Sequence, residues 1–164
     1  MINMKTFTYR QQIRSSDIEA IAAIVESTGF FSDEELEIAI ELAEDKLDKQ
    51  EVSSYRFLIA EDGSRVVGYT CYGLIPATSF SYDIYWIVVV NDMRGQGLGK
   101  YLMAETEKLI ELSGGRQIYA ETSSRKQYEP TRKFYETCGY HQEAFLKNFY
   151  NEGDSKIIYA KVLK

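Results

Sequence analysis

The sequence predicts one mixed α/β domain with a central, mostly antiparallel sheet. The length of the chain and its hydrophobic periodicity predict it. The chain has 164 residues, which is about the size of one domain. Residues 16–49 show helical periodicity, residues 55–90 show consecutive strand patterns, and residues 97–163 alternate between the two. The expected order is therefore βααβββαβαββ, with neither a repeat nor a linker dividing residues 1–164.

The N-terminal third predicts a strand and two helices. Alternating polar and apolar residues indicate a strand over residues 6–14. Ser16 with Glu19 forms a capping-box pattern that opens a helix. Ser32 with Glu35 repeats this pattern and opens a second helix, which has an apolar face and a charged face.

The middle third predicts three antiparallel strands in succession. Segments 55–61 and 65–75 flank Asp62-Gly63, a dipeptide typical of a two-residue hairpin turn of type I′. Segment 81–90 is apolar enough to lie in the middle of a sheet. These segments therefore form an antiparallel meander.

The C-terminal part predicts alternating helices and strands. Gly114-Gly115 and Gly139 each follow an expected helix end, and Pro130 lies in the first turn of the shorter helix. The expected elements are a helix over 97–112, a strand over 117–123, a short helix over 130–138, and a closing hairpin of strands over 140–150 and 156–163.

Charge and composition exclude several classes of protein. Nineteen Lys and Arg against 25 Asp and Glu give a net charge of −6. Nucleic-acid binders depend on a basic footprint, so the acidic balance argues against a nucleic-acid partner and favours a cationic substrate such as an amine. The chain has one His and two Cys, which is too few for a zinc site built on several such ligands, so no metal is expected.

The N-terminal residues and the lengths of the apolar runs indicate the cellular compartment of the protein. Residues 1–12 contain no apolar signal-peptide core, and the longest strictly apolar run, Ile84–Val90, is far shorter than a membrane span. We therefore expect a cytoplasmic protein without a membrane partner.

The most informative segment is a glycine-rich turn, DMRGQGLGK at residues 92–100, between the apolar strand and an amphipathic helix. Its three glycines let the backbone approach a ligand closely, and the start of the helix offers unpaired N–H groups. An oxyanion such as a pyrophosphate suits that helix end, and Arg94 and Lys100 add two cationic contacts. The turn therefore predicts a phosphate site.

Two common phosphate-binding motifs do not fit this turn. A Walker A motif needs Ser or Thr directly after its Gly-Lys pair, but Tyr101 follows Lys100. A Rossmann fingerprint needs a different glycine spacing and a strand that opens a βαβ unit, whereas this strand closes a meander. The pattern that remains is R-x-x-G-x-G, formed by Arg94, Gly97 and Gly99.

This pattern resembles that of the GNAT superfamily of acetyl-CoA-dependent N-acetyltransferases, in which the turn holds the pyrophosphate of coenzyme A. A second motif, residues 134–140 with the sequence FYETCGY, is similar to the family's FYxxxGF. The resemblance extends over residues 8–163 and is nearest to enzymes of the ribosomal-protein alanine type, which acetylate protein N-terminal amines. It implies the GNAT fold, with a splay between the fourth and fifth strands.

The resemblance also implies which residues bind acetyl-CoA. Backbone amides of the splayed strand pair with the pantetheine arm in the family, and by position these are Ile87, Val88 and Val89. The pyrophosphate would lie against Arg94, Gly95, Gln96, Gly97, Leu98, Gly99 and Lys100. Many members have Asn seven residues before the motif tyrosine, where this chain has Tyr128, and we expect Tyr128 to stack or hydrogen-bond in its place.

Amide formation from a thioester needs a neutral amine and a donor near the leaving thiolate. Tyr135 is the expected donor by its place in the second motif. Transfer from a tyrosine of pKa near 10 to a thiolate of pKa near 8.5 is uphill by roughly 2 kcal/mol, so a hydrogen bond and full proton transfer both stay open.

Glu121 is the preferred base, because an acid in an apolar strand is costly unless it is exposed or useful. The related N-terminal acetyltransferases have a strand glutamate at the matching place. Asp83 and Tyr85 on the preceding strand are the alternatives, and Tyr150 in the closing hairpin is expected to line the acceptor cleft.

Two functions fit these residues. The first is N-acetyl transfer from acetyl-CoA to a small-molecule amine or a peptide N-terminus, through a direct ternary complex. The second is a catalytically silent acyl-CoA-binding or sensor domain of the same fold. Tyr135 together with Glu121 favours the enzyme, since a sensor needs neither. Many relatives are dimers, so the resemblance also makes a homodimer an expectation.

Overall fold

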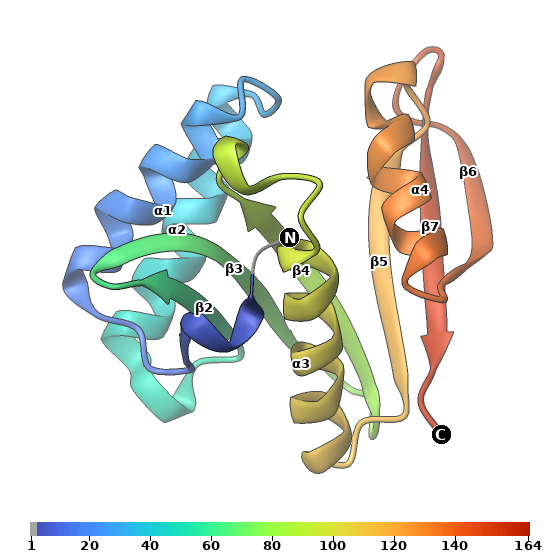
Figure 1. Cartoon of the computed structure of the whole chain (residues 1–164). Coiled ribbons are helices and arrows are strands. Elements are labelled where there is room, and N and C mark those ends of the chain that lie inside the picture. Colours follow the sequence, from blue (N-terminus) through green and yellow to red (C-terminus); the bar gives the residue numbers. More distant parts are fainter. Residues whose placement is uncertain (1–2) are drawn as a thin grey trace. The chain divides into compact units, whose positions relative to one another are not determined.

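The computed structural model describes residues 3–164 (Figure 1). Its strands and helices are β1 (Thr8–Arg10), α1 (Ser15–Ser27), α2 (Asp33–Lys49), β2 (Arg56–Asp62), β3 (Arg65–Leu74), β4 (Ser81–Val89), α3 (Leu98–Leu112), β5 (Gln117–Ser123), α4 (Glu129–Thr137), β6 (His141–Asn151) and β7 (Asp154–Val162). Short 3₁₀ helices lie between some of them. The predicted order βααβββαβαββ is confirmed.

The strands form one seven-stranded sheet in the order β1-β2-β3-β4-β5-β7-β6. β4 pairs in parallel with β5, whereas the pairs β1–β2, β2–β3, β5–β7 and β6–β7 are antiparallel. The parallel register runs from Ser81 opposite Gln117 to Ile84 opposite Ala120, and both strands then continue for several residues. The prediction of a mixed, mostly antiparallel sheet is confirmed.

Backbone packing divides the described chain into two units. The first contains residues 3–73 and 86–106, and the second contains residues 74–85 and 107–164. The chain changes unit at the end of β3, within β4 and within α3. The expected single domain over residues 1–164 stays a prediction.

In the first unit, α1 and α2 lie side by side (Figure 1). The capping box at the start of α2 is confirmed, since Ser32 and Glu35 each accept the other's backbone N–H, at 3.2 and 2.8 Å. The expected Ser16–Glu19 box is wrong, because α1 begins at Ser15 and the carboxylate of Asp17 accepts the N–H of Arg14 at 2.6 Å.

The hairpin between β2 and β3 is confirmed, but its turn type is corrected. Asp62 pairs with Arg65, so the turn residues are Gly63 and Ser64 rather than Asp62 and Gly63. Gly63 has a φ of 62°, and Ser64 is not among the residues with positive φ. A type I′ turn requires positive φ at both positions, so this turn is not of that type.

In the second unit, β5 has two different faces. Ala120 and Thr122 are buried on one face, whereas the side chain of Glu121 points to the other face and is exposed. Across the antiparallel pairing, Tyr159 of β7 lies opposite Ala120 and Ile157 lies opposite Thr122. α4 runs along β5 and β7 (Figure 1), on the face that carries Ala120.

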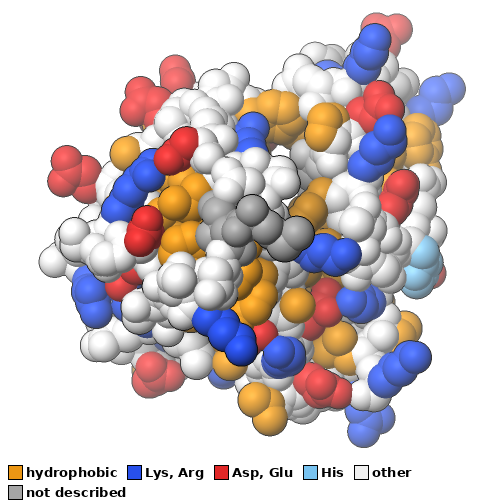
Figure 2. Space-filling view, viewed as in Figure 1, with side chains coloured by type: hydrophobic (Ala, Val, Ile, Leu, Met, Phe, Trp, Pro, Cys, Tyr) orange, Lys and Arg blue, Asp and Glu red, His pale blue; other side chains and the backbone are white. Residues whose placement is uncertain are grey.

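Acidic and basic side chains are interspersed on the face of the molecule in Figure 2, so this face shows no large patch of one sign. Across residues 3–164, no helix has both the length and the apolar character needed to cross a membrane.

Candidate active site

The glycine-rich turn connects β4 to α3. Gly95 and Gly97 have φ values of 71° and 93°, a left-handed backbone in which other residue types are strained. A Cβ atom at Gly95 would meet nothing within 4 Å, and one at Gly97 would meet the Met4 side chain at 3.9 Å. The backbone path therefore requires these glycines, and the protein leaves space beside them.

Polar contacts hold this turn within the first unit. The Arg65 guanidinium forms a two-pronged ion pair with Asp92, with N–O distances of 2.9 and 3.0 Å. The Gln96 amide donates to the carbonyl oxygen of Asp92 at 3.1 Å, and the Asn91 amide donates to that of Ser27 at 2.8 Å. The turn is thereby anchored to β3 and α1.

The predicted phosphate contacts lie at the start of α3. Its first helical hydrogen bond runs from the Tyr101 N–H to the Gly97 carbonyl at 3.0 Å. The N–H groups of residues 98–100 lie before this bond, at the helix end where N–H groups have no acceptor within the helix. The side chains of Arg94 and Lys100 are exposed beside them. An anion bound here would meet backbone donors, the positive end of the helix dipole and two cations.

The predicted pantetheine contacts lie on β4 in the same unit. Ile87 and Val89 are half-buried, and Val88 is buried. The next residue, Val90, donates its N–H to the carbonyl of Val67 on β3 at 2.9 Å. β4 is therefore fixed to β3 directly before the glycine-rich turn.

A carboxylate pair lies on one face of the second unit. In the parallel register Asp83 lies opposite Tyr119, so the Asp83 and Glu121 side chains project from the same face. The Nζ atom of Lys156 on β7 lies 2.8 Å from Oε2 of Glu121. Three ionisable groups thus meet on this face.

Lys156 also lies beside two aromatic rings of β6. Its Nζ is 3.8 Å from the centre of the Phe149 ring and 5.7 Å from that of Tyr150, which is within cation–π range. The Lys156 side chain is only 13% exposed, against 47% for Glu121. Lys156 contacts both Glu121 and the Tyr150 ring. Tyr150, which is predicted to line the acceptor cleft, therefore lies on the face of the carboxylate pair.

The two carboxylates differ in environment. Burial and the neighbouring charge of Glu121 raise the pKa of Asp83 from 3.8 to about 6, against the opposing effect of Lys156. Glu121 is more exposed and has Lys156 as a direct ion-pair partner. A carboxylate of pKa near 6 is ionised at neutral pH and is a stronger base than an ordinary aspartate. Of the pair, Asp83 thus has the environment typical of a proton acceptor.

Tyr135 belongs to α4 and packs on the opposite face of the sheet. The centre of its ring is 5.6 Å from that of Tyr159 and 5.9 Å from that of Tyr140. Tyr159 lies opposite Ala120 in the β5–β7 pairing, which places Tyr135 on the face away from Glu121. Burial raises the pKa of Tyr135 well above its ordinary value of 10, so its hydroxyl stays protonated.

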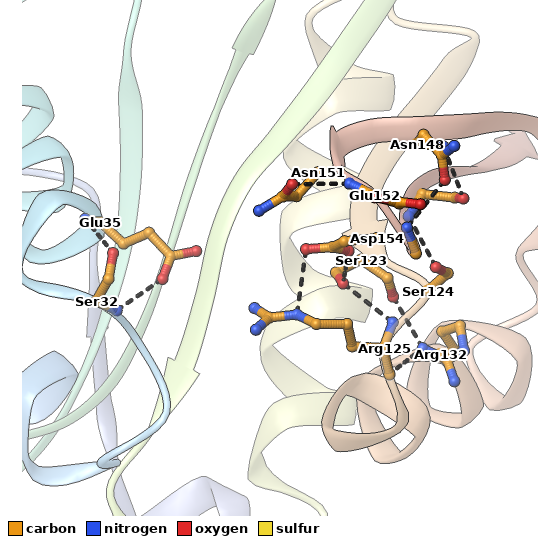
Figure 3. A network of polar contacts seen from close by, with 12 residues as sticks. Ser32, Glu35, Ser123, Ser124, Arg125, Arg132, Asn148, Asn151, Glu152 and Asp154 are labelled. Carbon is orange, nitrogen blue, oxygen red and sulfur yellow. Dashed lines mark hydrogen bonds and ion pairs between the residues drawn. The ribbon is translucent and has the colours of Figure 1, made fainter.

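The loop between β5 and α4 is tied to the β6–β7 turn (Figure 3). Asp154 accepts a hydrogen bond from the Ser123 hydroxyl and pairs with Nε of Arg125 at 3.2 Å. Arg132 donates to the carbonyl oxygens of Ser123 and Arg125 at 2.8 and 2.9 Å. Tyr128, which directly precedes α4, is buried with the Arg125 guanidinium 5.3 Å from its ring centre. Its predicted contact with the cofactor stays a prediction.

The structure brings the predicted site residues together in two groups. The first unit contains the glycine-rich turn with Ile87, Val88 and Val89. The second contains Asp83, Tyr85, Glu121, Tyr128, Tyr135 and Tyr150. Lys156 was missed by the sequence analysis. A lysine between the buried residues Ser155 and Ile157 of β7 is a signal in the sequence. Its role becomes clear only from the register of β7 against β5.

Comparisons with known proteins agree with this fold and these motifs. The family profile described as an acetyltransferase (GNAT) domain matches residues 53–142. A solved structure of a GNAT-family acetyltransferase from Desulfovibrio desulfuricans is similar with a TM-score of 0.93 and 43% identity, covering 95% of this chain and 98% of that one. The family profile and this similar structure support an acyltransferase. The chain belongs to the GNAT family.

More distant solved structures share the fold. An aminoglycoside 6′-N-acetyltransferase in complex with coenzyme A has a TM-score of 0.74 at 19% identity, covering 94% of this chain and 96% of that one. A ribosomal-protein-alanine N-acetyltransferase from Escherichia coli has a TM-score of 0.72 at 16% identity, covering 96% and 94%. No curated protein sequence matches the chain.

Proposed function

We propose that this protein transfers the acetyl group of acetyl-CoA to a primary amine through a direct ternary complex. One observation carries the proposal: Asp83 of β4 and Glu121 of β5 form a carboxylate pair on one face of the sheet, and the buried ring of Tyr135 of α4 packs on the other face. Amide formation from a thioester needs a proton acceptor for the amine and a donor for the thiolate. The carboxylate pair supplies the proton acceptor, and the Tyr135 hydroxyl supplies the donor.

The glycine-rich turn supports acetyl-CoA as the cosubstrate. Gly95 and Gly97 leave space beside backbone donors, and Arg94 and Lys100 supply positive charge at the same place. In our proposal the pyrophosphate lies against this turn and the pantetheine arm pairs with the backbone of residues 87–89. The coenzyme A complex of a protein with the same fold supports this choice.

In the proposed reaction, the amine nitrogen attacks the carbonyl carbon of the thioester. The ammonium form of the acceptor first gives a proton to Asp83, directly or through one water, because its raised pKa makes Asp83 a stronger base than an ordinary aspartate. The C–S bond then breaks, the departing thiolate accepts a hydrogen bond from Tyr135, and the second proton that the nitrogen loses passes to the thiolate, directly or through solvent. The products are free coenzyme A and the acetylated amine. Glu121, the base preferred from the sequence, is the alternative in this proposal.

The acceptor is a small-molecule amine or a peptide N-terminus. Relatives of the same fold are named for acceptors of both kinds, an aminoglycoside and a ribosomal-protein alanine. In this chain, Phe149 and Tyr150 present exposed aromatic rings on the face of the carboxylate pair, and Lys156 lies between them and Glu121. These residues would line the acceptor side of the site.

The test is the release of coenzyme A thiol with a panel of amines. The panel contains a peptide with a free N-terminus, free lysine, a polyamine and an aminoglycoside, each with acetyl-CoA and the purified chain. We expect thiol release that depends on at least one amine and yields the N-acetylated product by mass spectrometry. Tight binding of acetyl-CoA without release for any amine would instead support the acyl-CoA-sensing alternative.

The Gly97→Glu variant should lose coenzyme A binding. The new carboxylate would lie against the pyrophosphate and repel it. Coenzyme A at about 100 times its Kd should raise the melting temperature of the parent by roughly 5–10 °C, and that of the variant by nothing measurable. Thermal melting with and without the ligand checks this.

The control for backbone strain is Gly97→Ala. Its φ of 93° strains any side chain there, so both variants should lose intrinsic stability by about the same amount. Gly97→Ala adds no charge and should keep most of the ligand-induced shift. If coenzyme A protects Gly97→Glu as well as it protects the parent, the assignment of the pyrophosphate to this turn is wrong.

A further inference from the structure

Lys156 places a positive charge on the face of the carboxylate pair. Its Nζ lies 2.8 Å from Oε2 of Glu121 and 3.8 Å from the centre of the Phe149 ring. A lysine side chain that is only 13% exposed needs partners for its ammonium group, and the carboxylate and the ring supply them. The ammonium group of Lys156 therefore has a defined place on this face.

Together with the two carboxylates, Lys156 gives this face one net negative charge. Besides burial, which raises it most, the pKa of Asp83 responds to the charge of Glu121, which raises it, and to that of Lys156, which lowers it. At about pH 8, well above the pKa of Asp83, two carboxylates and one ammonium group leave one net negative charge. Asp154, the acid at the start of β7, is already paired with Arg125 (Figure 3).

One net negative charge matches an acceptor that carries one ammonium group. In the proposed function the acceptor arrives as an ammonium ion and gives its proton to Asp83. Its positive charge balances that of the face, so a second cation on the acceptor would find no uncompensated carboxylate and would be repelled by Lys156. The exposed rings of Phe149 and Tyr150 beside Lys156 offer apolar surface to the carbon chain that carries the amine.

We propose that Lys156 selects the acceptor by its charge, favouring a monoamine whose remaining part is neutral or carries a carboxylate over a diamine or a polyamine. This inference rests on the proposed function and names the class of acceptor more narrowly. Specificity of this kind arises from repelling the wrong partner as well as from binding the right one. Lys156 contacts no reacting atom in this account and takes no proton from the acceptor.

The test compares three short amines, butylamine, 4-aminobutanoate and 1,4-diaminobutane, whose far ends are neutral, negative and positive. Three tripeptides that differ only in a central Gln, Glu or Lys form a second set with the same change of charge. For each acceptor, kcat/KM is measured by thiol release at about pH 8 and is divided by the value for the neutral member of its set. This ratio cancels effects that all acceptors share, such as a change in the basicity of Asp83.

The Lys156→Gln variant should change these ratios in opposite directions. It leaves two negative charges on the face and no cation, so the ratio for the cationic acceptor should rise about tenfold over that of the parent. The ratio for the anionic acceptor should fall. In the parent, the cationic member of each set should be the poorest acceptor of the three.

Two matched variants check the sign of the effect. Lys156→Arg keeps the positive charge and should keep the ratios of the parent. Glu121→Gln removes a negative charge from the same ion pair, so its ratio for the cationic acceptor should fall below that of the parent, which tests the inference independently of whether Lys156→Gln folds.

The outcomes separate failure of this inference from failure of the proposed function. Parent-like ratios in Lys156→Gln and Glu121→Gln, an equal rise in Lys156→Arg, or a parent that uses only the polyamine or the aminoglycoside of the panel would each overturn the charge selection while leaving acetyl transfer in place. A parent that releases thiol with neither set and with no amine of the panel would overturn the proposed function, and this inference with it.

Discussion

The Tyr135→Phe variant should release coenzyme A about 10- to 100-fold more slowly than the parent, with less than about a twofold change in its affinity for acetyl-CoA. The variant keeps the ring that packs on Tyr159 and loses only the hydroxyl. A hydrogen bond to a charged group is worth about 1.5–3 kcal/mol, and the thiolate carries its charge only as it departs. The loss should therefore fall on kcat, measured by thiol release.

The pH dependence of this loss tests how the hydroxyl acts. Burial raises the pKa of Tyr135, so the hydroxyl stays protonated throughout an assay from about pH 6 to 9. The ratio of parent to variant rates should therefore be constant over that range. A ratio that collapses at the alkaline end would show that Tyr135 ionises within the range, contrary to this account.

Tyr159→Phe is the control for packing. Tyr159 lies in the same aromatic layer, and its hydroxyl donates to Glu136 at 3.2 Å. Removing that hydroxyl should leave the rate within about twofold of the parent. Equal slowing of the two variants would assign the effect to the layer as a whole, and a parent-like rate for Tyr135→Phe would make Tyr135 a structural residue.

Local patterns predicted the order of helices and strands but not every helix cap, since the expected Ser16–Glu19 box does not form. The Ser32–Glu35 capping box is made by residues three apart, and it forms as expected. The hairpin turn was misplaced by one residue, because Asp62 pairs with Arg65 and a register shift between Ala60 and Glu61 precedes it. The turn dipeptide alone does not show such a shift.

The residues of the proposed site divide in the same way between local and distant signals. The glycine-rich turn and the second motif are contiguous, so the sequence named Gly97 and Tyr135 directly. The contribution of Lys156 depends on the pairing of β5 with β7, and the difference between Asp83 and Glu121 depends on their relative burial. Both are properties of distant segments packed together, and neither has a local signature.

The Asp83→Asn variant should be about 100-fold slower than the parent near neutral pH and should recover at high pH. A general base must be ionised, so the kcat/KM of the parent should rise as pH increases through about 6, the pKa of Asp83. Asparagine accepts no proton, so this acidic limb should disappear. The variant should speed up only as the acceptor loses its own proton, near pH 8 for an α-amine and about 10.4 for a lysine. Rates from about pH 5 to 10 check this.

Glu121→Gln is the matched variant on the same face, and it should behave differently. It removes the negative charge that raises the pKa of Asp83 and leaves Lys156, whose positive charge lowers that pKa, without its carboxylate partner. The acidic limb should therefore persist and move to lower pH, with a rate near neutrality within a few-fold of the parent. If Glu121→Gln instead loses the limb while Asp83→Asn keeps it, Glu121 is the base. If both keep it unmoved, neither carboxylate accepts the proton.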